Sequence, residues 1–141
     1  MKTVERNLFP KNERLCLQKN IDRLFATGKS FISYPLRIIY LSAPENNASE
    51  SGISVLVSVP KKRIRQAVAR NRIKRLIRES YRLNKNDVSS ACKQNGEPLH
   101  LAFLYLGNDV KKYYDMQTAM QSALETIKAR LRSREMHHGK K

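Results

Sequence analysis

Apolar positions along the first half of the chain change from helical to extended spacing. Leu17, Ile21, Leu24 and Phe25 recur at helical spacing, which predicts a short first helix. Asn20 is the predicted N-cap of this helix, and Gly28 is its predicted left-handed C-terminal stop. Residues 31–33, 36–41 and 53–59 are rich in β-branched and aromatic side chains and predict three strands, with Pro35 interrupting the run and a polar loop over 42–52.

The second half predicts a helix over 66–83, a loop over 84–98 and a strand over 100–106 whose apolar composition is typical of a buried central position. Met116, Ala119, Met120, Ala123, Leu124, Ile127 and Leu131 then form one stripe of a terminal helix. The order of elements predicts the α+β class: a single αβββαβα sandwich domain, in which helices pack on a mostly antiparallel four-stranded sheet.

The helix over 66–83 is cationic on one side. At about 100° per residue, a single arc of about 140° holds Arg70, Asn71, Lys74, Arg75, Arg78 and Arg82. The opposite side is apolar and holds Ala69, Ile73, Leu76, Ile77 and Leu83. Like charges one turn apart destabilise a helix, so this pattern favours a polyanionic partner that neutralises them.

Charge is concentrated around this helix. The chain of 141 residues has a formal net charge of +16, and residues 61–85 hold 11 Lys and Arg against one acid. A local concentration of this kind is typical of a nucleic-acid-binding surface rather than of a solvated face. Membrane-surface binding also uses basic helices, but it favours boundary aromatic residues such as Trp, and the chain has no Trp.

Side chains suited to catalysis are scattered. The 12 acids stand singly, the five glycines form no phosphate loop, and no His or Cys residues have metal-ligand spacing. His100 is interpreted as a hydrogen-bonded residue at a strand edge. Cys16 and Cys92 are expected to be free thiols in the cytoplasm, since the N-terminal residues lack an apolar signal region and no stretch is apolar enough to span a membrane.

One motif carries a family resemblance. Lys61 and Lys62 follow a strand, and the run from Ala67 to Arg78 contains Arg-Asn-Arg at 70–72 and Lys-Arg at 74–75. Together with Lys19-Asn20 and Leu24-Phe25-x-x-Gly28, this pattern resembles the protein subunit of bacterial ribonuclease P over roughly residues 14–132. The resemblance implies a left-handed βαβ crossover in the fold.

The resemblance also implies a function. The chain would be the non-catalytic protein cofactor of the ribonuclease P ribozyme, which removes the 5′ leader of precursor tRNA. Its partners would be the catalytic RNA and that leader, with no membrane and no required protein partner. The Mg²⁺ ions would be held by the RNA, and the protein alone would bind no cofactor or metal.

Site residues follow from the same resemblance. The residues implied to bind the RNA subunit are Arg70, Asn71, Arg72, Lys74, Arg75, Arg78 and Arg82. The cleft for the leader is implied to involve Phe25, Ile21, Lys61, Lys62, Arg63 and Arg65. Ile21 stands where the family often has a second Phe, and plain core packing is an alternative interpretation of Phe25.

Domain boundaries and two other functions complete the prediction. Residues 1–14 are expected to be a flexible basic arm, 15–132 the folded domain and 133–141 a disordered basic tail. A structural ribosomal protein is an alternative, although such proteins more often spread charge through extended tails. A DNA-binding architectural protein is a second alternative, although no helix-turn-helix or zinc pattern precedes the basic helix.

Overall fold

The computed structural model describes residues 18–42, 53–95 and 98–139, with side chains except at 93–95 and 132–139. Its elements are α1 (Gln18–Thr27), β1 (Lys29–Ser33), β2 (Leu36–Ser42), β3 (Ile53–Ser58), α2 (Ala67–Asn84), α3 (Asn86–Asn95), β4 (Leu99–Tyr105) and α4 (Tyr113–Gly139). The predictions for the arm 1–14, the loop 42–52 beyond its first residue, Cys16 and Leu17 fall outside the described residues.

The four strands form one sheet in the order β1-β2-β4-β3. β1 pairs with β2 and β2 with β4 in antiparallel fashion, whereas β3 and β4 are parallel. The predicted α+β class with a mostly antiparallel sheet is therefore confirmed. The parallel pair is joined through α2 and α3, as in a βαβ crossover, and the hand of this crossover stays a prediction.

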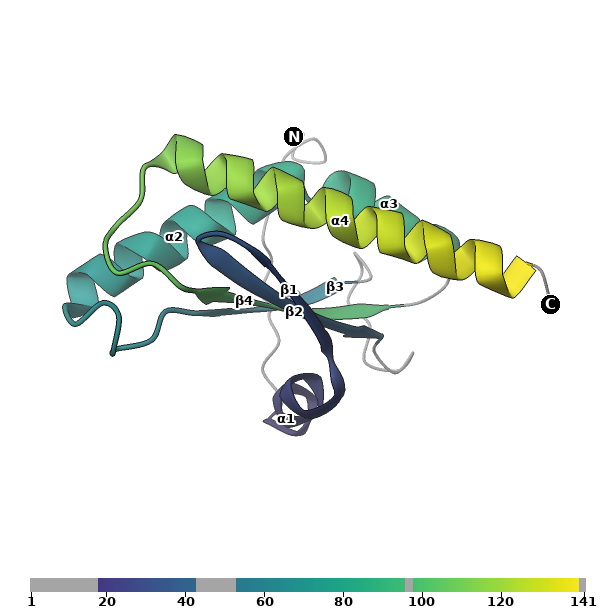
Figure 1. The fold of residues 1–141 in the computed structure, drawn as a ribbon, viewed down its shortest axis with the longest axis horizontal. Coiled ribbons are helices and arrows are strands. Elements are labelled where there is room, and N and C mark those ends of the chain that lie inside the picture. The colour runs from purple at the N-terminus through teal and green to yellow at the C-terminus, as the bar shows by residue number, and fades with distance from the viewer. Residues whose placement is uncertain (1–17, 43–52, 96–97, 140–141) are drawn as a thin grey trace, which may run out of the picture.

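Helices cover both faces of the sheet (Figure 1). α2, α3 and α4 pack on one face over a large core that includes Ile38, Phe103, Ile77 and Met120. α1 lies on the other face, where Leu24 packs with Ile39 and Ala102 in a smaller cluster. Because neighbouring residues of a strand point to opposite faces, each central strand supplies side chains to both clusters.

The region after α2 corrects the sequence prediction. Residues 84–98 are not a loop, because α3 occupies Asn86–Asn95. Its Val88 and Cys92 are buried in the large core, against which α4 also packs. Tertiary burial of this apolar side stabilises a helix whose own residues have weak helical propensity. Cys92 forms no disulfide within the described chain.

The predicted N-cap of α1 is wrong, whereas the predicted stop at Gly28 is correct in place, because α1 ends at Thr27, but wrong in conformation. Asn20 is the third residue of the helix and is buried, so it is not an N-cap. Gly28 does not have a left-handed backbone. Its amide donates to the carbonyl oxygen of Leu24, and an added Cβ would overlap that oxygen and the Ile39 side chain. Close approach of the backbone to β2, rather than a positive φ, explains the glycine.

Three further positions differ from expectation. Leu83, predicted on the apolar side of α2, is exposed because it lies in the last turn of the helix. His100 is not an edge residue, since β4 lies between β2 and β3 and buries it. α4 continues to Gly139 and so enters the segment predicted as a disordered tail. The domain boundaries themselves stay a prediction.

Candidate nucleic-acid interface

The cationic side of α2 remains accessible after folding. Ile73, Ile77 and Tyr81 bury the apolar side of the helix, while Asn71, Arg72 and Arg75 are exposed on the other side. Lys74 and Arg78 are half-buried at its flanks. Among the described residues, no carboxylate pairs with Arg72, Lys74 or Arg75. These side chains are therefore available to an anionic partner.

Arg82 and Arg70, which belong to the predicted set, interact with other groups of the protein. Arg82 donates to Glu79 three residues earlier, and this hydrogen bond is the main cause that lowers the pKa of the Glu79 carboxyl. Arg70 donates to the carbonyl oxygens of Ile64 and Arg65 at 3.0 and 2.7 Å. Arg70 thus holds the segment before the helix against its first turn, a role that the sequence pattern does not reveal.

The segment between β3 and α2 places a second group of cations beside the helix. Ile64 anchors it in the core, whereas Lys61, Lys62, Arg63 and Arg65 are exposed. Arg63 also donates to the carbonyl oxygen of Leu106, at 2.7 Å, and so ties this segment to the end of β4. The two predicted groups of basic residues are therefore adjacent parts of one surface.

The face of the sheet that carries α1 is only partly covered. On this face, the row of side chains nearest the β1–β2 turn consists of register partners from the four strands, namely Ile32, Arg37, Leu104 and Ser58. Ile32 and Arg37 are exposed and Leu104 and Ser58 are half-buried. We call these four residues the open strip. It lies between α1 and the basic segment, because Ser58 ends β3 just before Pro60.

The two predicted cleft residues of α1 differ in their surroundings. Ile21 packs against the small cluster with Leu24, whereas Phe25 is 45% exposed and belongs to neither core cluster. Core packing of Phe25 is therefore not observed. Arg37, which the sequence analysis did not select, is a cation on the same face of the sheet. Its signal was a single polar residue inside the apolar strand pattern of 36–41.

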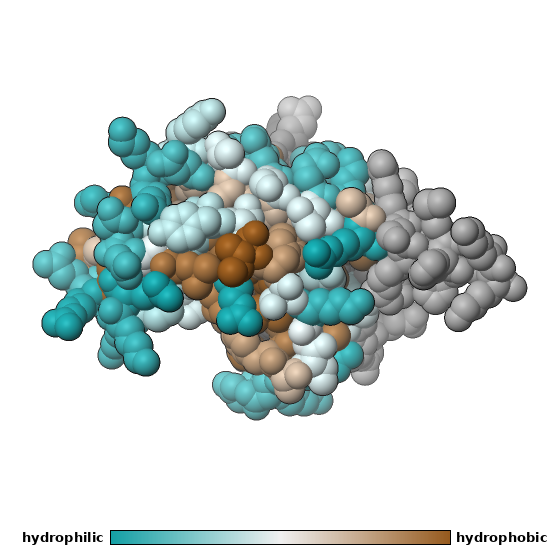
Figure 2. Space-filling view, viewed as in Figure 1, coloured by the Kyte–Doolittle hydropathy of each residue, from teal (hydrophilic) through white to brown (hydrophobic). Residues whose placement is uncertain are grey.

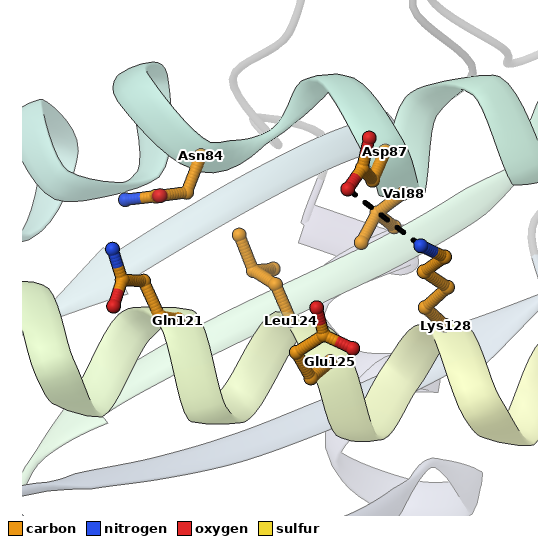
Figure 3. A pocket seen from close by; sticks show the side chains of 7 residues that line it. All are labelled: Asn84, Asp87, Val88, Gln121, Leu124, Glu125 and Lys128. Atoms are coloured by element: carbon orange, nitrogen blue, oxygen red, sulfur yellow. Dashed lines mark ion pairs between the residues drawn. The ribbon is translucent and has the colours of Figure 1, made fainter.

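A small cavity lies apart from these surfaces, between α4 and the α2–α3 junction (Figure 3). Its volume is ≈ 80 Å³, and Asn84, Asp87, Glu125 and Lys128 are among its lining residues. Lys128 Nζ lies 3.6 Å from an Asp87 carboxylate oxygen. The cavity is far smaller than the usual ligand pocket of about 300–1,000 Å³, and its carboxylates disfavour a phosphate ligand.

Two kinds of feature are absent from the described residues. No group of three or more His, Cys, Asp and Glu side chains there is arranged to hold a metal ion. No described helix is long and apolar enough to cross a membrane.

Comparison with known proteins agrees with these features. The ribonuclease P family model matches residues 9–128. The ribonuclease P protein component of Porphyromonas gingivalis is 42% identical over 117 residues, which cover 83% of this chain and 84% of the relative. That of Chlorobium phaeobacteroides is 36% identical over 107 residues, which cover 72% of this chain and 73% of the relative.

Solved structures share the fold. The RNase P protein from Staphylococcus aureus superposes with a TM-score of 0.60 at 19% identity, covering 82% of this chain and 95% of that chain. The RNase P protein from Thermotoga maritima gives a TM-score of 0.56 at 19% identity, covering 83% of this chain and 96% of that chain. Since the family model spans most of the sequence and close relatives align over most of their length, this chain belongs to the ribonuclease P protein family.

Proposed function

We propose that this chain is the protein subunit of a ribonuclease P holoenzyme and promotes removal of the 5′ leader from precursor tRNA. The observation that carries the proposal is the continuous basic surface of α2 and residues 61–65. Among the described residues, no carboxylate pairs with the exposed side chains of Lys61, Lys62, Arg65, Arg72 and Arg75. Such a surface fits the closely spaced phosphates of a folded RNA.

In this proposal α2 binds the RNA subunit. Arg72 and Arg75 present guanidinium groups to solvent, and Arg is suited to phosphate because its planar fork can donate two parallel hydrogen bonds. Lys74 and Arg78 extend the same face, with Asn71 as a neutral donor. Arg70 positions the basic segment through its two backbone contacts, and Arg82 contributes at the far end of the helix.

The open strip is the proposed path of the leader. An unpaired strand can place its bases on apolar or aromatic side chains and its phosphates on nearby cations. Phe25 and Ile21 supply the apolar side at α1, Arg37 supplies a cation within the strip, and Lys61, Lys62, Arg63 and Arg65 supply cations at the β3 end. The strip spans four strands, or about 14 Å between the outer two.

The chemistry of cleavage is assigned to the RNA subunit. The charged side chains gathered on the proposed surface are mostly Lys and Arg, which donate hydrogen bonds and do not coordinate a divalent cation. Mg²⁺ bound by the RNA would activate the attacking water and stabilise the scissile phosphate. The protein would hold both RNAs in register, an effect on binding and orientation rather than on bond making.

Reconstitution tests the proposal. Purified protein, a bacterial ribonuclease P RNA and precursor tRNA with a 5′ leader are combined at low Mg²⁺ concentration. We expect cleavage at the mature 5′ end only when protein and RNA are both present, since reduced Mg²⁺ leaves the phosphates unscreened and makes protein cations necessary. Cleavage by the protein alone would contradict the division of labour.

The same assay separates the alternatives. Tight RNA binding without stimulation of cleavage would favour a structural ribosomal protein, which co-sedimentation with ribosomal subunits would identify. Equal affinity for duplex DNA and leader-bearing precursor tRNA at one salt concentration would favour the architectural DNA-binding protein.

A further inference from the structure

Tyr34 is an aromatic side chain that the fold leaves in solvent at one end of the open strip. It precedes Pro35 in the turn between β1 and β2, and it is 61% exposed. Figure 2 shows hydrophobic side chains gathered over the turn end of this hairpin, with hydrophilic side chains around them. A single exposed apolar residue is common, so exposure alone does not indicate that Tyr34 has a function, and its surroundings must be considered.

A cation lies over the Tyr34 ring. Lys111 Nζ is 5.5 Å from the ring centroid, within the range of a cation–π interaction. Lys111 also pairs with Asp109 at 3.3 Å, and this carboxylate raises the pKa of the lysine. One face of the ring therefore has a partner, and much of the remaining ring surface is open to solvent.

The loop that carries Lys111 is fixed to the sheet at three points. The Leu106 amide donates to the Pro35 carbonyl oxygen at 2.7 Å, and Arg63 donates to the Leu106 carbonyl oxygen. The buried Tyr105 hydroxyl donates to the Asp109 carbonyl oxygen. A Cβ on Gly107 would lie only 2.8–3.0 Å from atoms of the Tyr105 side chain, so the loop approaches this side chain as closely as glycine allows.

Tyr34 lies next to the Ile32 end of the open strip, in the turn that follows β1. The row runs from Ser58 through Leu104 and Arg37 to Ile32, which is 65% exposed on the edge strand, and Tyr34 lies two residues beyond Ile32. α2 packs beside β3 at the opposite edge of the sheet. A strand that enters beside α2 and crosses the row therefore reaches the β1–β2 turn last.

We propose that Tyr34, held in place by Lys111, is a stacking platform for an unpaired base of the 5′ leader, at the part of the leader farthest from the cleavage site. The proposal rests on the proposed function, in which the open strip takes the leader. Stacking on a tyrosine ring suits this partner because every base has a π-face, so the contact tolerates any leader sequence. Exposed Lys112 is available for the adjoining phosphate.

A series of precursor tRNAs whose leaders lengthen by one nucleotide at a time tests the proposal in the reconstituted holoenzyme. For the wild-type protein, the affinity for precursor tRNA rises with leader length, and the last increase, or step, occurs at the length at which a base reaches Tyr34. Tyr34→Leu removes that step, weakening binding of long leaders by about tenfold, while short leaders bind as before. Tyr34→Phe keeps the ring and keeps the step.

Tyr114→Leu is the matched control, because Tyr114 is also highly exposed but lies in the first turn of α4. This variant is expected to match the wild type at every leader length. The platform is overturned if Tyr34→Leu matches the wild type throughout, if it weakens all lengths equally, if Tyr114→Leu has the same effect, or if Tyr34→Leu instead weakens binding of the RNA subunit.

Failure of the proposed function has a different signature. In that case the wild-type holoenzyme itself binds leader-bearing and mature tRNA equally, and the platform is rejected together with the leader path. A leader-dependent wild type with an unaffected Tyr34→Leu variant rejects the platform alone.

Discussion

The His100 imidazole is buried in β4, and neither of its ring nitrogens has a hydrogen-bond partner among the described residues. It lies on the face that α1 covers, level with Leu41 and Ser54 of the neighbouring strands. Burial, and to a lesser extent the charge of Arg23, lower the pKa of His100 below its ordinary value of 6.5. An unpartnered imidazole of this kind is stable in the fold only while it is neutral.

This residue predicts a pH dependence of stability. Above about pH 6.5 neither the folded nor the unfolded chain binds a proton at His100, so the group has no effect. As pH falls below that value the unfolded chain binds the proton first, and the free energy of unfolding decreases until the pH reaches the lower pKa of the folded state. Urea unfolding followed between about pH 7 and pH 5.5 measures the slope.

His100→Gln is the comparison, since it cannot take up the proton. The variant should lose stability at every pH but show a flatter pH dependence than the wild type. Equal slopes for the two proteins would show that other groups cause the dependence.

Sequence patterns predict correctly the residues whose place is set by the periodicity of a helix or strand. They fail for residues whose role is set by tertiary packing. The β-branched composition of 53–59 predicted a strand that supplies core residues such as Val55, and the stripe of the terminal helix identified core residues such as Ile127. The left-handed backbone predicted for Gly28 is wrong because this glycine is required by close approach to the distant strand β2, a contact that local patterns do not contain. Asn20 lies buried within α1 rather than at its start. Arg70 was assigned to RNA for its place in the motif, and its internal contacts depend on the path of the preceding segment.

At the scale of elements, α4 is attached to the β1–β2 hairpin by a small aromatic cluster. Arg130 donates to the Tyr40 hydroxyl at 2.7 Å, and its guanidinium lies 4.9 Å from the Phe31 ring centroid. The Phe31 and Tyr40 rings meet edge to face. About three helical turns nearer the start of α4, the Ser33 hydroxyl donates to the Ala119 carbonyl oxygen.

Arg130→Ala should therefore lower the free energy of unfolding by about 1–2 kcal/mol, through the lost hydrogen bond and cation–π contacts. Chemical denaturation measures the change. Lys128→Ala is the control on the same helix, because its ion pair with the exposed Asp87 is worth less than about 1 kcal/mol. Equal losses in the two variants would contradict a specific role for the aromatic cluster.

α3 shows why the element prediction was incomplete. Its sequence contains Asn, Asp and Ser, which favour turns and caps over helix interiors. The helix is stabilised by Val88 and Cys92, which complete the core beside α4, an element that follows much later in the chain. The sheet order is likewise invisible to periodicity, since strand patterns indicate burial but not neighbours.

For the whole molecule, the net charge of +16 predicts a strong salt dependence of RNA binding. Arg72→Ala combined with Arg75→Ala should weaken the binding of the RNA subunit and make the slope of log affinity against log salt shallower by about one to two. Because both side chains are exposed and have no internal partner among the described residues, the melting temperature should change little.

Lys19→Ala combined with Lys29→Ala removes the same charge from exposed positions on α1 and β1. This control variant should retain nearly the wild-type slope for the RNA subunit. If the two double variants behave alike, the net charge rather than the α2 surface determines binding.

The central place of β4 in the sheet has a consequence for synthesis of the protein. β3 has no described strand neighbour other than β4, and β2 gains its second neighbour only from β4, although β4 is the last strand in the chain. A nascent chain that ends before residue 99 therefore has only the β1–β2 pairing, and the apolar side of α2 has no completed sheet to pack on. Formation of the sheet must await contacts between distant parts of the chain, which makes folding slow and cooperative. The cationic face of α2 thus reaches its folded arrangement only after nearly the whole protein has been translated. Interrupted translation products therefore contain the basic residues but not the folded surface.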